Sequence, residues 1–76
     1  MDISDIMTRL AGAERLRGMA SAARIAADLW MADDDQRQRA EDAARRWEAE
    51  ATAILTSIPR DRLPVEFGGS AVWRRV

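Results

Sequence analysis

The amino-acid sequence predicts an all-α protein: an antiparallel helical hairpin with a short N-terminal helix or helix extension and a non-helical C-terminal tail. Apolar residues recur at helical spacing throughout the first 58 residues. Both prolines, and two of the four glycines, lie after that point. The 76 residues are enough for one small domain. We therefore expect a helical part over residues 1–58 and a Pro- and Gly-containing tail over residues 59–76.

The first turns of the chain have helical spacing, but their apolar face points in an unexpected direction. The apolar residues of this segment are Ile3, Ile6, Met7, Leu10 and Ala13. In an unbroken helix, their face is rotated by roughly 160° from the apolar face that begins at Leu16. Either the chain bends near Gly12 or Gly18, or one long helix contacts two different partners. Glycine in a helix costs about 1 kcal/mol relative to alanine, so two glycines favour the bend.

Two longer amphipathic segments follow, over residues 14–32 and 35–58. Asp33 and its two acidic neighbours have the composition of a helix cap and a tight turn. Pro59 ends the second segment because it disfavours helical geometry at Ile58. Such a short connection makes the two helices pack as an antiparallel pair.

The facing sides of these helices are rich in alanine, which allows close approach near the short end of the 8–10 Å range. We expect Trp30 and Trp47 to lie in the core. The apolar surface of residues 14–32 is nevertheless wider than one helix can cover. A homodimer with a four-helix core is the simplest way to cover it, and the groove of a different protein is the other. The residues predicted for the core and for self-association are Leu16, Met19, Ala23, Leu29, Trp30, Trp47, Ile54 and Leu55.

The tail contains two short apolar runs on either side of Gly68 and Gly69, a pattern typical of a small β-hairpin. An extended, unpaired tail is the alternative. Aromatic and arginine side chains dominate binding hot spots, and those of the tail lie outside both helical faces. We therefore predict that the tail binds a partner. The residues predicted for this contact are Phe67, Trp73, Arg74 and Arg75.

Composition excludes several kinds of chemistry. Without cysteine or histidine, the chain cannot form disulfides or thiolate zinc sites, and it lacks the commonest general base. The formal net charge of -1 gives no general basic footprint for nucleic acid. A helix-turn-helix over residues 8–30 is a weaker alternative, since Arg24 is the only cation of its second half, which has no Asn, Gln or Lys to contact bases. We expect no cofactor, no metal and no catalysis.

These observations predict a small non-enzymatic protein-binding module, such as a bacterial or phage accessory or inhibitor protein that occupies the surface of a partner. The alternatives are a small DNA-binding transcriptional regulator and a structural subunit of a larger assembly. No apolar run reaches the length of a transmembrane helix, and the N-terminus lacks the pattern of a signal peptide. The sequence therefore predicts a cytoplasmic protein without a membrane contact.

Overall fold

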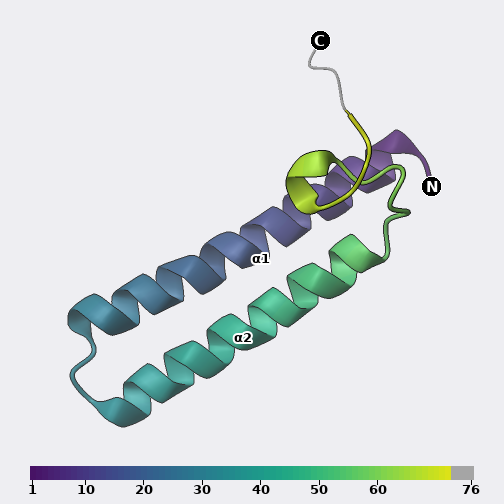
Figure 1. The fold of residues 1–76 in the computed structure, drawn as a ribbon. Coiled ribbons are helices and arrows are strands. Elements are labelled where there is room, and N and C mark those ends of the chain that lie inside the picture. The colour runs from purple at the N-terminus through teal and green to yellow at the C-terminus, as the bar shows by residue number, and fades with distance from the viewer. Residues whose placement is uncertain (73–76) are drawn as a thin grey trace.

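The computed structural model describes residues 1–72 and shows an elongated pair of antiparallel helices. Helix α1 spans Ile3–Trp30, helix α2 spans Asp34–Thr56, and a short 3-10 helix, η1, spans Val65–Phe67. The molecule measures 45 × 23 × 18 Å. Figure 1 shows the interhelical turn at one end and the N-terminus together with the tail at the other. The predicted all-α hairpin is confirmed, and residues 1–72 contain no strand.

Helix α1 runs without interruption, so the favoured bend near Gly12 or Gly18 is wrong and the alternative, a helix extension, is what the structure shows. Its 28 residues include both Gly12 and Gly18. Asp2 caps the helix by accepting a hydrogen bond from the backbone N–H of Asp5 at 2.9 Å. Contact with α2 along its length outweighs a glycine cost of about 1 kcal/mol at each site. One straight helix therefore carries apolar side chains on two different sides.

The predicted acidic cap is confirmed at the start of α2. The side chain of Asp33 accepts a hydrogen bond from the backbone N–H of Asp35 at 2.9 Å, which satisfies one of the free donors at the helix start. Across the turn, Arg37 Nε donates to the carbonyl oxygen of Met31 at 2.6 Å. These contacts hold the three-residue connection in place.

Buried residues at every seventh position, most of them alanine, form the contact between the two helices. The buried residues of α1 are Ile6, Ala13, Ala20 and Ala27. Their counterparts on α2 and just beyond it are Ala44, Ala51 and Ile58. A seven-residue repeat keeps one narrow seam of each helix facing the other, as in a coiled coil. Because this seam consists mostly of alanine, the helices pack closely and bury little apolar volume between them.

The core is correspondingly uneven along the molecule. At the tail end, buried Ile6, Leu55, Ile58 and Leu63 form one cluster with the neighbouring alanines. Towards the turn, the fully buried residues of the described chain are alanines only. They are Ala20, Ala27 and Ala44. The turn half of the hairpin thus lacks a large buried side chain.

The tail does not form the predicted β-hairpin. Val65–Phe67 is a 3-10 helix, and Gly68 follows it in the left-handed conformation with φ 88°. The chain then returns so that the backbone N–H of Ala71 donates to the carbonyl oxygen of Leu63 at 3.0 Å. This compact loop packs Leu63 into the core and Phe67 against its edge. The glycines correctly predicted that the chain reverses direction here. The backbone conformation on either side of them depends instead on packing against the helices.

We expect Ala44→Leu to destabilise the hairpin by about 1–3 kcal/mol, because the enlarged side chain overpacks the seam. Urea denaturation followed by circular dichroism measures the change. Ala49→Leu is the matched control, since Ala49 lies exposed on the same helix. Equal stability of the two variants would contradict the close-packed seam.

Gly69→Ala should also destabilise the protein, by a similar 1–3 kcal/mol, roughly the cost of overpacking. A Cβ atom at this position would overlap the backbone carbonyl of Leu63, which cannot move without disturbing the core. The contrasting variant is Gly12→Ala, whose Cβ meets no atom within 4 Å and which should stabilise α1 by about 1 kcal/mol. Thermal unfolding of both variants tests whether the tail is docked as described.

Candidate protein-binding surfaces

One broad side of the hairpin carries an ion-pair network that joins the two helices. Arg24 of α1 reaches Glu48 of α2 through both guanidinium Nη atoms, with Nη2 3.2 Å from Oε2. Its Nε also lies 3.6 Å from Oε2 of Glu41. The hydrogen bond from Arg24 lowers the pKa of the Glu48 carboxyl from its ordinary value of 4.5. We call this the charged side of the hairpin.

The opposite broad side is apolar. Over residues 16–30 of α1 and 40–54 of α2, helical spacing places on it five residues and four residues respectively, none of them charged. They are Leu16, Met19, Ala23, Ala26 and Trp30 of α1, and Ala40, Ala43, Trp47 and Ile54 of α2. We call this set the apolar side. Seven of the nine are half-buried, whereas Met19 and Trp30 are exposed.

Trp30 is 78% exposed, so the prediction that it lies in the core of this chain is wrong. It follows Ala27 of the seam by three residues, and this spacing turns it about 60° away from the facing helix. Trp47 is half-buried, and helical spacing turns it about 60° from Ala44 of the seam. Both tryptophans therefore belong to the apolar side, where a further surface could cover the exposed ring of Trp30.

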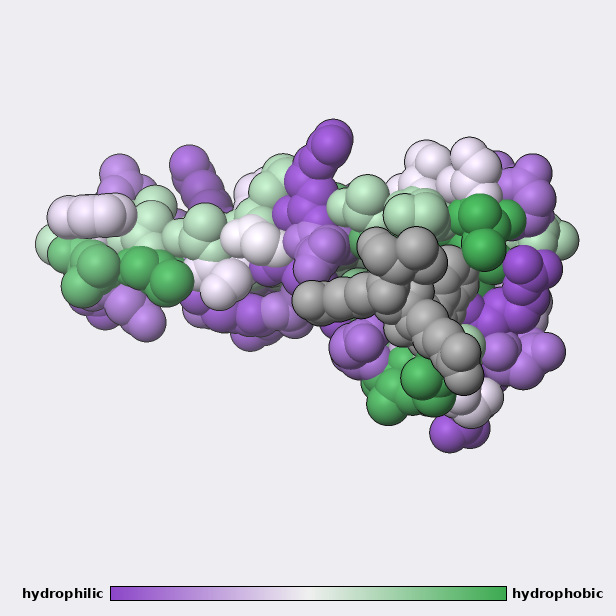
Figure 2. Space-filling view, turned by 90° about the horizontal axis from the view of Figure 1, so that it is seen from above, coloured by the Kyte–Doolittle hydropathy of each residue, from purple (hydrophilic) through white to green (hydrophobic). Residues whose placement is uncertain are grey.

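The outer ridge of α1, facing away from α2, is the second apolar surface. It consists of Gly18, Ala22, Ile25 and Leu29. Ile25 is 53% exposed and Leu29 is 66% exposed. Figure 2 shows hydrophobic side chains gathered at the turn end of the molecule, on the left of the view. Between residues 18 and 30, the only polar side chains are Ser21, Arg24 and Asp28, which share one narrow strip.

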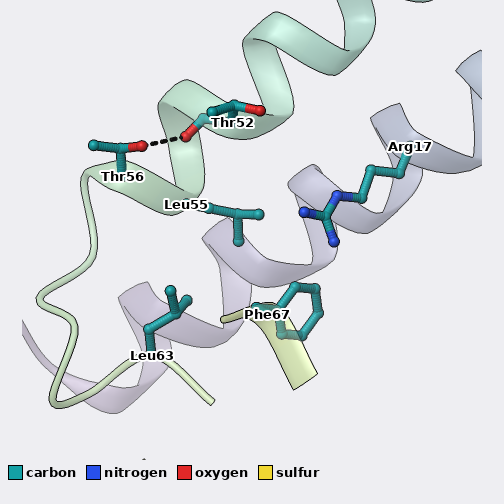
Figure 3. A pocket seen from close by; sticks show the side chains of 6 residues that line it. All are labelled: Arg17, Thr52, Leu55, Thr56, Leu63 and Phe67. Atoms are coloured by element: carbon teal, nitrogen blue, oxygen red, sulfur yellow. Dashed lines mark hydrogen bonds between the residues drawn. The ribbon is translucent and has the colours of Figure 1, made fainter. Parts of the chain in front are cut away.

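A shallow pocket lies where the tail meets the helices (Figure 3). It is lined by Arg17, Thr52, Leu55, Thr56, Leu63 and Phe67, and its volume is about 210 Å³. The guanidinium carbon of Arg17 lies 5.7 Å from the ring centroid of Phe67, within cation–π distance. The Thr56 hydroxyl donates to the carbonyl oxygen of Thr52 at 2.7 Å. The pocket is smaller than the 300–1,000 Å³ typical of ligand sites.

The predicted tail contact is only partly within the described residues. Phe67 is half-buried and packs against the core cluster and Arg17, so in this structure it covers the helices of its own chain. Trp73, Arg74 and Arg75 lie outside the described residues. Their assignment to a partner contact stays a prediction.

The remaining residues predicted for the core and for self-association lie in the core cluster, on the apolar side or on the outer ridge, and two of them belong to both of the first two places. Leu55 is buried in the core cluster, and Leu16 and Ile54 pack against it. Leu16, Ile54, Met19 and Ala23 also border the apolar side. Leu29 lies on the outer ridge. The signal that sequence reasoning missed is the strict seven-residue spacing of the seam, which would have placed Trp30 and Leu29 outside it.

The described residues hold no group of three or more carboxylates placed to bind a metal ion. Neither α1 nor α2 contains the length of apolar sequence that crossing a bilayer requires.

No protein family, curated protein or solved structure matched this chain when it was compared with each. A functional interpretation therefore depends on the placement of its side chains.

Stability should depend on pH through Glu48. Its pKa is lowered in the folded state, so the ion pair stabilises the fold above about pH 4.5 and the contribution is lost as pH falls through the folded pKa. We expect wild type to be more stable than Glu48→Gln at neutral pH, with the difference shrinking below pH 4.5. NMR titration of the Glu48 carboxyl should give a midpoint below 4.5. An equal difference between the two proteins at acidic and neutral pH would exclude this role.

Proposed function

We propose that this chain is a small non-enzymatic protein-binding module that acts by occupying the surface of a partner protein. The observation that carries the proposal is the outer ridge of α1, where Ile25 and Leu29 stand exposed on a rigid helix. Large apolar side chains on a surface helix are typical of protein contacts. An accessory or inhibitor role fits a module that offers a binding surface.

The ridge has the geometry by which a helix enters a groove. Gly18, Ala22, Ile25 and Leu29 follow the spacing of four, three and four residues, which places anchors along one face. The two small residues leave space for the walls of a groove to approach the backbone, and the two large ones supply apolar area. Apart from the adjacent turns of its own helix, a Cβ at Gly18 would meet no atom of residues 1–72 within 4 Å, which leaves space for a partner.

The alternative of a DNA-binding helix is weakened by the ion pairs of Arg24. This residue is the only cation between residues 19 and 31, and its guanidinium is held by Glu48 and Glu41. Contact with phosphates would require breaking that network, and residues 19–31 contain no other cation to replace it.

Leu29→Glu should weaken partner binding by at least about 30-fold, the effect of losing a hot spot worth 2 kcal/mol or more. Ala53→Glu is the matched control because Ala53 is exposed on α2, away from the ridge. Both variants and wild type are immobilised and used to purify binding proteins from the native host, with quantitative mass spectrometry. The proposal requires a protein that wild type and Ala53→Glu retain and Leu29→Glu loses. Equal recovery by all three would refute it.

A further inference from the structure

We infer that a second copy of this chain packs on the apolar side, so that two hairpins form a four-helix bundle. The inference goes beyond the proposed function, because it uses the apolar side and leaves the outer ridge free for a different protein. Two-fold pairing through one self-complementary face is the commonest form of oligomer.

The turn half of the hairpin lacks large buried side chains. There the seam buries Ala20, Ala27 and Ala44, and no larger side chain. Met19, Trp30 and Trp47 border the same region, and two of these three are exposed. A tryptophan alone can bury about 150–250 Å² of surface. A second layer of helices on the apolar side would give this half the large apolar contacts that the tail supplies at the other end.

The broad side of the hairpin is large enough for a stable interface. Stable interfaces bury about 800 Å² on each partner, roughly a seventh of the 5758 Å² that this molecule exposes. The length and width of the molecule, 45 and 23 Å, provide a broad side large enough for that contact. The nine residues of the apolar side carry no charge, so contact between them desolvates no ion. The charged residue at the helical position of Ala23, Asp5, lies on this side only at the open end of the hairpin.

The distribution of charge favours one relative orientation of the two copies. The charged side, with Arg24 and Glu48, lies on the opposite face of each hairpin and would remain in water on both copies. Asp33, Asp34 and Asp35 concentrate negative charge at the turn. Two copies with their turns together would bring six carboxylates to one end, and like charges repel. The copies should therefore lie antiparallel, with their turns at opposite ends of the bundle.

Sedimentation equilibrium of the full chain from micromolar to millimolar concentration tests the assembly. Wild type should approach twice the chain mass of 8.5 kDa. Trp30→Glu and Ala26→Glu should remain monomeric at concentrations where wild type is dimeric, with helix content retained in circular dichroism. Leu29→Glu is the matched control on the outer ridge of the same helix and should still form the dimer.

Orientation is tested with a spin label on Asp34→Cys, which is unique because the chain contains no other cysteine. Pulsed electron resonance should give a label separation that is a large part of the 45 Å length. A separation of only about two helix spacings of 8–10 Å would overturn the antiparallel arrangement.

The outcomes distinguish this inference from the proposed function. An 8.5 kDa monomer at all concentrations overturns the dimer, and the proposed function then stands if Leu29→Glu still loses its partner. If Leu29→Glu breaks the dimer and Trp30→Glu does not, the copy occupies the outer ridge, which overturns the inference. A dimer broken only by the variants of the apolar side supports it.

Discussion

The close packing of alanines at every seventh position is the constraint on which the rest of this structure depends. Ala13, Ala20 and Ala27 of α1 meet Ala44 and Ala51 of α2 in a narrow seam. Where the seam consists of alanine it has no room for large side chains, so towards the turn they lie on its flanks or on the outer side of the helices. The exposure of Trp30 and Leu29 is therefore a consequence of how the hairpin closes.

The two ends of the hairpin differ in how much apolar side-chain volume is packed against the seam. At the open end, the tail folds back and adds Leu63 and Phe67 to the cluster around Ile6. The close approach of Gly69 to Leu63 allows that loop to close. At the turn end, no segment of the described chain has this role. The surfaces that remain uncovered there are the ones to which we assign protein contacts.

Sequence periodicity and cap chemistry predicted the hairpin, its acidic turn and the end of α2 near Pro59. They favoured a bend and kept the uninterrupted α1 only as the alternative, whereas a glycine penalty of about 1 kcal/mol is small beside continuous packing against another helix. Between residues 18 and 30, apolar residues occupy all but one strip of the helix. Periodicity alone could not decide which part of that wide arc would face α2, and this is why Trp30 was misplaced. The tail conformation depends on residues far away in sequence, because Leu63 is buried in the same cluster as Ile6 of α1.

The alanine seam leaves the turn half of the hairpin without a core of its own, and we propose that an added surface stabilises it. Amide hydrogen exchange measured at low and high protein concentration tests this most directly, because protection reports local stability along each helix. We expect amides around Ala20 and Ala44 to exchange faster than those around Ile6 and Leu55 in dilute solution. Protection of the amides around Ala20 and Ala44 should then rise with protein concentration. Uniform protection along both helices at every concentration would contradict it.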